Sequence, residues 1–229
     1  MNGDPGGNPG GNPSGNPSGE WSTLLSVQNT ARRTAALINA LSVDDAGSDS
    51  PDSSSVDSSS TDSEAADSEA ADAAVADAVV EVLRAYGEPG PFSLSARDIA
   101  EMRAAAESLR EVFAVEDDRD AAGAVAVLNP LLERTTGTFR LTSHSTGSPW
   151  HPHLDSHDDA PWGEWFLASS CLALTVLVWD RQRPPGGLCA SPRCRNVFVT
   201  LNSGPARRYC SVRCATRERV AAHRRARAE

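Results

Sequence analysis

The chain carries a cysteine-rich stretch at residues 189–214, which reads CASPRCRNVFVTLNSGPARRYCSVRC. Cys189 and Cys194 form a first pair around a Pro-containing turn, and Cys210 and Cys214 form a second pair with helical i, i+4 spacing. Zinc takes four thiolate ligands at the corners of a tetrahedron, and two close pairs separated by a loop can supply them while ordering few residues. The stretch therefore predicts one structural Zn²⁺ bound by Cys189, Cys194, Cys210 and Cys214.

The residues between the two pairs predict a hairpin. Residues 196–201 alternate as in a strand, residues 202–205 form a turn, and residues 207–209 return toward the second pair. A helix that carries the second pair completes the order of a treble-clef-like zinc fold. A segment this small cannot close a core alone, and zinc would contribute on the order of 10 kcal/mol to its folding. We predict that residues 186–229 form a zinc finger.

The cysteines indicate structural rather than catalytic or redox chemistry. Four of the five lie within 26 residues, and in a reducing compartment this clustering favours metal binding over disulfides. Neither pair has the Cys-x-x-Cys spacing of a redox motif, and four thiolates leave no open position on a catalytic zinc. The fifth, Cys171, lies in an apolar run and is interpreted as a buried, inert thiol. Because we also find no Gly-rich phosphate loop, nucleophile motif or paired carboxylates, we expect a protein that is not an enzyme.

Charge is distributed unevenly along the chain. The formal net charge is −10, yet residues 186–229 carry ten Arg and two Glu, a local net charge of +8. All 21 basic residues are Arg, a bias that high-GC codon usage alone would produce, although Arg can also bind phosphate bidentately. Basic charge on a rigid zinc module predicts a polyanion partner, DNA or RNA. We assign the nucleic-acid contacts to Arg193, Arg195, Arg207, Arg208, Arg213, Arg217, Arg224 and Arg227.

Two alternatives remain open for this basic surface. It could be a solvated tail that balances an acidic protein. It could instead belong to a zinc-stabilised protein-interaction module, whose basic face docks an acidic partner or the acidic insertion of the same chain. Nucleic acid would be favoured as the partner if DNA affinity falls steeply with salt and if part of that affinity depends on the base sequence.

Two segments are too polar to contribute to a core. Residues 1–20 repeat Gly-Gly-Asn-Pro and Ser-Gly-Asn-Pro, which predicts a disordered leader. Residues 44–73 are almost entirely Ser, Asp, Ala and Glu, which predicts a disordered acidic insertion. The insertion is either a solubilising linker or an arm that contacts the basic tail and competes with its polyanion partner. With neither a signal peptide nor a run of about 18 apolar residues, the protein is expected in the cytoplasm, without membrane contact.

The remaining sequence predicts a mainly α fold with minor β in a domain that covers residues 21–182. Residues 21–41 predict a short strand or turn followed by a helix. Further helices are predicted at residues 73–85, after a capping box at Ser95 and Asp98, and at residues 120–134, with a strand at residues 138–142. Residues 162–180 are the most apolar segment and predict the central core helix.

Residues 143–161 predict a polar loop that is rich in His and Asp. The side chains concerned are His144, His151, His153 and His157, with Asp155, Asp158 and Asp159. They could chelate a divalent ion or form a hydrolytic site. The alternative is a flexible loop without groups that orient the ligands.

The C-terminal stretch resembles the CGNR zinc finger of bacterial transcription regulators, in which two Cys pairs flank a hairpin that ends Arg-Arg-Trp-Cys. Residues 207–210 read Arg-Arg-Tyr-Cys here, with Tyr in place of Trp. Residues 214–217 read Cys-Ala-Thr-Arg, so the eponymous tetrapeptide keeps its Cys and Arg and loses its Gly and Asn. The second pair is also one residue tighter than in the family. The resemblance implies a bacterial transcription regulator with one zinc ion.

The preceding region, residues 24–180, is similar in order of elements to the helical ABATE domain that precedes this finger. Residues 27–30, Val-Gln-Asn-Thr, resemble the Asn-Thr start of that domain, and the acidic stretch would be an insertion after its first helix. Because a domain upstream of a bacterial DNA-binding module is expected to sense a small molecule, we expect the helical domain to bind such a ligand. A DNA reader with so small a finger would also benefit from forming a homodimer.

Overall fold

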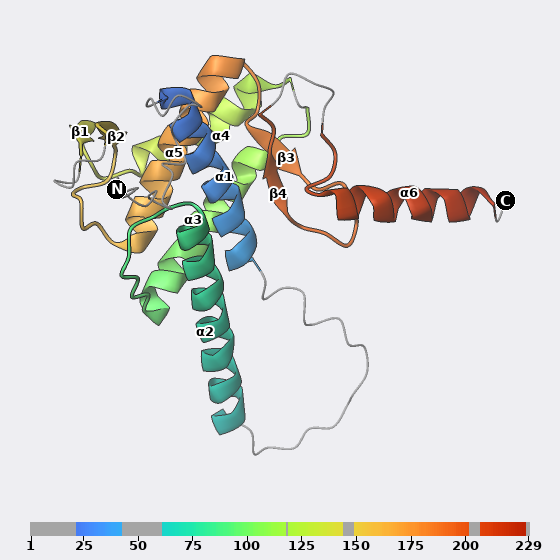
Figure 1. Cartoon of the computed structure of the whole chain (residues 1–229), viewed down its shortest axis with the longest axis horizontal. Helices are drawn as coiled ribbons and strands as arrows, with labels where there is room; N and C mark the ends of the chain where they lie inside the picture. The colour runs from blue at the N-terminus through green and yellow to red at the C-terminus, as the bar shows by residue number, and fades with distance from the viewer. Residues whose placement is uncertain (1–21, 43–60, 118, 144–148, 202–206, 228–229) are drawn as a thin grey trace, which may run out of the picture.

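The computed structural model describes residues 22–42, 61–117, 119–143, 149–201 and 207–227 (Figure 1). Its helices are α1 (Thr23–Leu41), α2 (Thr61–Ala85), α3 (Ala96–Phe113), α4 (Ala121–Glu133), α5 (Trp162–Arg181) and α6 (Val212–Ala226). Two antiparallel hairpins accompany them, β1 (Arg140–Thr142) with β2 (His151–His153) and β3 (Gly186–Leu188) with β4 (Val197–Val199). The predicted mainly α fold with minor β is confirmed, while the predicted leader at residues 1–20 lies outside the described ranges.

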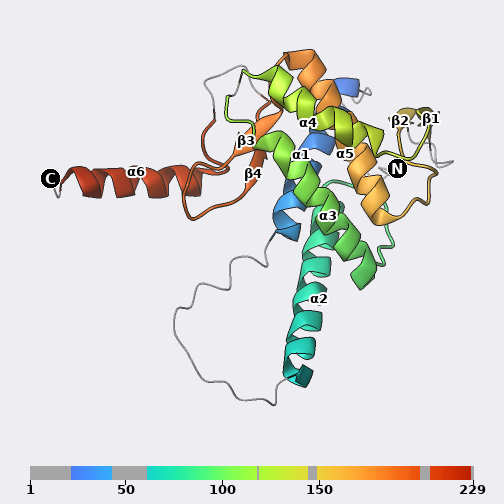
Figure 2. The same ribbon diagram turned by 180° about the vertical axis from the view of Figure 1, so that it is seen from behind.

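Helix α5 is the centre of the helical body, by which we mean α1 to α5. It packs against α1, α3 and α4 (Figure 2), and Phe166, Leu174 and Leu177 are completely buried. Gly163 allows close contact with α3, because a Cβ atom there would lie only 2.7 Å from the Cβ of Glu101. Among the described helices, α5 is long and apolar enough to cross a membrane, yet more than half of that span is buried in the protein. The prediction of a central core helix is confirmed.

Helix α1 begins earlier than its polar residues suggest. Ser22 caps it by accepting a hydrogen bond from the Leu25 N–H, and the helix continues without interruption to Leu41. The polar Asn29 finds a partner, since its side-chain amide donates to the Tyr86 carbonyl at 3.4 Å. The predicted short strand or turn before this helix is therefore wrong. Complete burial of Ala31, directly after the polar residues 28–30, shows that tertiary packing outweighs the local polar signal.

Helix α2 also begins earlier than expected. It starts at Thr61, so the predicted disorder of the acidic insertion is wrong over residues 61–73, while residues 44–60 lie outside the described part of the chain. Alanine is the strongest helix former, and the sequence of α2 is rich in Ala. Val75, Val79 and Leu83 are buried and anchor the C-terminal half of α2 against α1 and α3.

The other elements follow the predictions more closely. The Ser95 and Asp98 capping box of α3 is present, and α4 lies within the predicted range. The strand predicted at residues 138–142 is confined to β1. Its partner β2 lies in the stretch predicted as a loop, where the register pairs Leu141 with Pro152. Three residues that include a proline give too short an alternation to reveal a strand.

Candidate metal centre and basic helix

The hairpin of β3 and β4 holds the first cysteine pair. Cys189 follows β3 directly and its N–H donates to the Asn196 carbonyl at 2.9 Å, while the Cys194 N–H donates to the Ser191 carbonyl at 2.9 Å. Gly186 is needed where the strands meet, because a Cβ atom there would lie 1.8 Å from the Phe198 carbonyl oxygen. The turn closed by the Cys194 N–H and the Ser191 carbonyl directs the thiols of Cys189 and Cys194 to the same side of the hairpin.

This pairing corrects the predicted hairpin. Strand β4 pairs with β3, which precedes the first cysteine pair, and residues 207–209 form no strand. The returning chain is instead held by two hydrogen bonds: the Ala190 N–H donates to the Arg208 carbonyl at 2.8 Å, and the Cys210 N–H donates to Cys189 Sγ at 3.4 Å. The turn predicted at residues 202–205 lies outside the described residues.

The second cysteine pair flanks the start of helix α6. Ser211 is the N-cap, and its hydroxyl accepts a hydrogen bond from the Cys214 N–H at 3.2 Å. Cys210 precedes the cap and Cys214 lies in the first turn, so both thiols point back from the helix N-terminus toward the first pair. The predicted ligand-bearing helix is confirmed for Cys214, whereas Cys210, predicted on the same helix, lies before the cap.

The four thiols converge on one point. Their Sγ atoms all lie within 4.8 Å of one another, with Cys210 Sγ at 3.6 Å from Cys194 Sγ and 3.7 Å from Cys214 Sγ. Four sulfurs bound to zinc at about 2.3 Å in a tetrahedron lie about 3.8 Å apart, and a disulfide would bring two of them to about 2.05 Å. The donor set and its spacing therefore fit one Zn²⁺.

The electrostatics of the cluster show that a cation is needed if all four cysteines are to be thiolates. Burial, followed by the neighbouring thiols of Cys194 and Cys189, raises the pKa of the Cys210 thiol to about 12. Four sulfurs so close together cannot all be thiolates unless a positive ion lies between them. A Zn²⁺ ion bound here would stabilise the thiolates and would join the hairpin to α6, which is the action of a structural metal.

The comparison with protein families agrees with this geometry. The family model described as the CGNR zinc finger matches residues 187–227. This segment is a CGNR zinc finger. No curated protein matches the chain. The match covers only the CGNR finger, so the ABATE-like character of the helical body stays a prediction.

An outer layer of polar side chains surrounds the thiols of the CGNR finger. Arg217 donates to Cys214 Sγ at 3.5 Å and to the Ser191 hydroxyl at 2.6 Å, and that hydroxyl donates to Glu218 at 2.6 Å. Four thiolates carry more negative charge than one Zn²⁺ can neutralise, so the guanidinium of Arg217 offsets part of the excess. Sequence analysis missed Ser191 and Glu218, although the i, i+3 spacing of Cys214 and Arg217 was a signal for this contact.

The eight predicted nucleic-acid contacts do not form one uniform surface. Arg217 faces the metal centre, and Arg207 donates to the Tyr209 and Cys210 carbonyls and lies over the Phe198 ring at 5.1 Å. The carbonyl of Arg195 accepts a hydrogen bond from Arg110 of α3. Seven of the eight residues are exposed, and Arg217 is half-buried; the exposed ones are Arg193, Arg195, Arg207, Arg208, Arg213, Arg224 and Arg227. Arg213, Arg224 and Arg227 follow one edge of α6.

The CGNR finger is attached to the helical body through β4. All three residues of β4 are buried, and Asn39 of α1 forms hydrogen bonds with the backbone of Val197. At the other end of the strand, Arg181 of α5 donates to the Thr200 carbonyl at 2.8 Å. Asn39 and Arg181 were missed by sequence analysis, because no local pattern shows that a side chain will bind a distant backbone.

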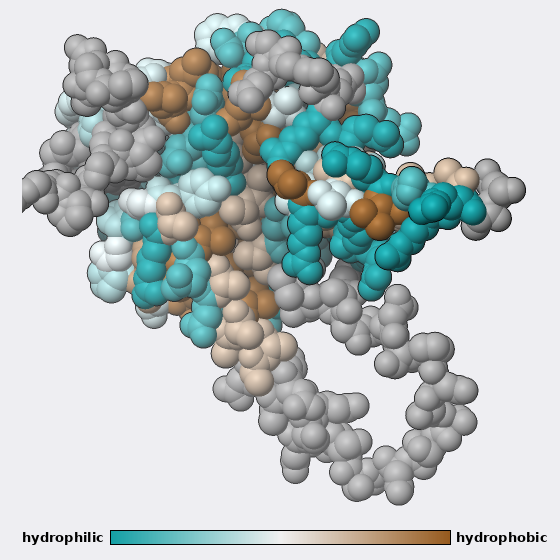
Figure 3. Space-filling model, turned by 45° about the vertical axis from the view of Figure 1, so that its right-hand side comes forward, coloured by the Kyte–Doolittle hydropathy of each residue, from teal (hydrophilic) through white to brown (hydrophobic). Residues whose placement is uncertain are grey.

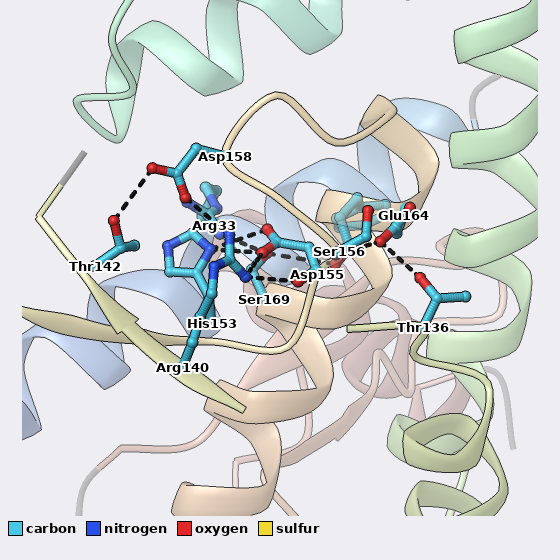
Figure 4. Close-up of polar contacts among 11 residues, drawn as sticks. Arg33, Thr136, Arg140, Thr142, His153, Asp155, Ser156, Asp158, Glu164 and Ser169 are labelled. Atoms are coloured by element: carbon cyan, nitrogen blue, oxygen red, sulfur yellow. Dashed lines mark hydrogen bonds and ion pairs between the residues drawn. The ribbon is translucent and has the colours of Figure 1, made fainter. Parts of the chain in front are cut away.

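The His-rich stretch forms an ion-pair cluster rather than a loop without fixed partners (Figure 4). His153 Nδ1 lies 2.8 Å from the Asp155 carboxylate, and Arg140 donates to both Asp155 and Asp158 at 2.8 Å. Within the described ranges, the only group of side chains spaced to hold a metal is the four cysteines. The predicted chelating or hydrolytic site gains no support, and His144 lies outside the described residues.

Proposed function

We propose that the protein is a zinc-dependent, nucleic-acid-binding transcriptional regulator that acts in the cytoplasm. The observation that carries the proposal is the position of α6. Figures 1 and 2 show this helix projecting from the body with its N-terminus beside the cysteine-bearing hairpin, and no other helix or strand of the described residues packs along it. A helix held at one end and open to solvent along its length is suited to bind an extended partner.

The charge of α6 supports a polyanion as that partner. The helix contains Arg213, Arg217, Arg219, Arg224 and Arg225, and Arg227 follows at its C-terminal cap. Its single acidic residue, Glu218, is engaged by Ser191 and Arg217. Figure 3 shows hydrophilic side chains crowded along this helix. Arginines on a preorganised helix contact phosphates without ordering a flexible chain.

Zinc supports the proposal through the stability of α6. The helix has 15 residues, and helices of up to about 12–15 residues are marginal in water unless something stabilises them. Metal ligation by Cys210 and Cys214 fixes its first turn, and the Ser211 cap satisfies one of its free N–H groups. We therefore expect removal of zinc to reduce nucleic-acid affinity.

The test is the salt dependence of binding to a random-sequence duplex, measured by fluorescence anisotropy with and without a chelator. The affinity should fall steeply between about 50 and 200 mM salt, and the magnitude of the slope of log K against log [salt] should drop by about 0.9 per lost phosphate contact. The test variant is Arg213→Gln with Arg224→Gln. The control is Arg84→Gln with Arg97→Gln, which removes the same charge from exposed positions on α2 and α3. Equal slopes for the two variants would contradict the proposal.

A second candidate function is a protein-interaction finger whose basic face docks an acidic partner or the acidic insertion. The observation that favours it is α2, which carries many acidic residues and extends beyond the other helices of the body (Figure 1). If the insertion competes with nucleic acid, deletion of residues 44–60 should raise DNA affinity at low salt. If it is only a linker, the deletion should leave that affinity unchanged.

We propose further that a small-molecule ligand acts where the helical body meets the CGNR finger. A hollow of about 620 Å³ lies there, between the end of α3 and the β3–β4 hairpin. Phe113 and Phe198 contribute aromatic surface, and its charged lining residues are Arg183, Arg207, Arg208, Glu116 and Asp117. Pockets of this size accommodate small ligands. Homodimer formation is also a proposal, which sedimentation of the zinc-loaded protein would test.

A further inference from the structure

Helix α6 has two different sides. The side toward the metal centre carries the buried Cys214, the half-buried Arg217 and Glu218, and Ala221. The opposite side carries Val212 and Val220, which are 83% and 45% exposed. In Figure 3, hydrophobic surface interrupts the hydrophilic covering of this helix. A helix that only followed phosphates would have no use for exposed valines.

The exposed valines belong to a regular stripe. Residues one turn apart lie on the same side of a helix, and Val212, Thr216 and Val220 follow each other at i, i+4 and i+8. We call these three residues the methyl stripe. At about 100° per residue, exposed Arg213 and Arg224 lie along one edge of the stripe and exposed Arg219 lies along the other. Methyl groups are therefore bordered on both sides by positive charge.

Duplex DNA in the B form matches this arrangement. An α-helix with its side chains is about 10–12 Å across, and the major groove of B-DNA is about 12 Å wide with phosphates along both rims. The floor of that groove displays the thymine C5-methyl group, which valine and threonine methyl groups can contact. The major groove of A-form RNA is deep and narrow and excludes side chains. The arginine edges complement the two phosphate rims.

We infer that α6 enters the major groove of B-form duplex DNA and that Val212, Thr216 and Val220 contact thymine methyl groups. Arg213 and Arg224 bind phosphates on one rim, and Arg219 binds phosphates on the other. This inference rests on the proposed nucleic-acid function and names the groove, the reading residues and the feature that they read. Arg219, which was outside the predicted contacts, becomes one of them.

The experiment compares two random-sequence duplex pools that differ only in replacement of thymine by deoxyuridine, which removes the C5-methyl group. Zinc-loaded full-length protein should select thymine-containing sequences from the first pool. Replacing the contacted thymines of a selected duplex by deoxyuridine should weaken binding about four-fold for each buried methyl group. Val220→Ala should bind the thymine duplex more weakly, and at one position its affinity should no longer change when thymine is replaced by deoxyuridine. Val125→Ala, at a partly exposed valine on α4, should respond to the replacement as the wild type does.

Several outcomes would overturn the inference while leaving the proposed function intact. One is salt-dependent and zinc-dependent binding in which deoxyuridine and thymine duplexes are equivalent. Another is equal or tighter binding of an RNA duplex or of single-stranded RNA. A third is a wild-type dimer that dissociates in the Val212→Ala, Val220→Ala variant, which would assign the stripe to self-association. Failure of the proposed function is distinct, since the protein would then bind neither pool in a salt-dependent manner.

Discussion

Asn39 of α1 and Val197 of β4 exchange two hydrogen bonds. The Asn39 Nδ2 group donates to the Val197 carbonyl at 3.0 Å, and the Val197 N–H donates to Asn39 Oδ1 at 2.8 Å. The side-chain amide therefore pairs with β4 as a neighbouring strand would. Val197 is only 1% exposed, so water cannot replace either bond.

Replacing Asn39 by Ala should lower the free energy of unfolding by about 2 kcal/mol, because two buried backbone groups lose their partners. Urea unfolding followed by circular dichroism measures this loss. Asn129→Ala, at an exposed position on α4, is the matched control and should change stability by less than about 0.5 kcal/mol. Similar losses in the two variants would show that the contact does not stabilise the protein.

The metal centre predicts one zinc ion per chain. Cys194→Ser should lose stoichiometric zinc in atomic emission measurements and lose part of the helical signal, because α6 depends on the metal for its first turn. Cys171→Ser is the control and should retain full zinc content, since that thiol lies in the core away from the cluster. Unchanged zinc in Cys194→Ser would contradict the ligand assignment.

Arg217 should tune the affinity for zinc without being a ligand. Arg217→Gln removes the charge near Cys214 Sγ and the hydrogen bond to Ser191, and loss of such outer contacts weakens metal binding by about 10- to 100-fold. Competition with a chromophoric chelator measures the affinity. Arg219→Gln removes the same charge from the opposite side of α6 and should leave zinc affinity within about two-fold of wild type.

Cys171 should resist alkylation. Burial raises the pKa of its thiol to about 12, so almost no reactive thiolate is present near neutral pH. We expect iodoacetamide at mildly alkaline pH to leave Cys171 unmodified with or without a chelator, while the four finger cysteines react once zinc is removed. Mass spectrometry of proteolytic fragments identifies the modified sites. Labelling of Cys171 at the rate of the other four would show that the core opens readily.

Asp155 should contribute stability that depends on pH. Burial acts to raise its pKa, but hydrogen bonds from His153 and Arg140 outweigh burial and the pKa lies below the ordinary value of 3.8. The contribution is therefore complete above about pH 4 and is lost as the pH falls through the lowered pKa. Asp155→Ala should cost about 1–2 kcal/mol at neutral pH and less under acid, while Asp159→Ala, an exposed carboxylate of the same stretch, should cost little at any pH.

The metal centre could be predicted from sequence because short stretches of sequence around the cysteines determine its geometry. A turn between Cys189 and Cys194, and a capped helix start between Cys210 and Cys214, fix how each pair points, whatever surrounds them. The partner of β4 could not be predicted in this way. Gly186 and Gly187 give no alternating side-chain signal, and their strand exists because β4 and the body lie beside it.

In the helical body, too, features set by local sequence were predicted and features set by distant contacts were not. The apolar length of α5 and the capping box of α3 are properties of their own residues and were predicted. The unbroken start of α1 depends on contacts that Asn29 and Thr34 make with distant segments, to the Tyr86 carbonyl and the Ser170 hydroxyl. Recognition of the ion-pair cluster around Asp155 likewise required knowing that the chain brings Arg140 back beside it.

The burial of β4 has a practical consequence for anyone who wishes to isolate the zinc-binding segment. Val197, Phe198 and Val199 are covered, with Val197 and Val199 belonging to the same apolar cluster as the body. A fragment cut just before Gly186 would expose these side chains to water and would lose the amide of Asn39. Such a peptide should bind metal yet tend to aggregate, so the sequence interval that a family profile delimits is smaller than the unit that folds cooperatively.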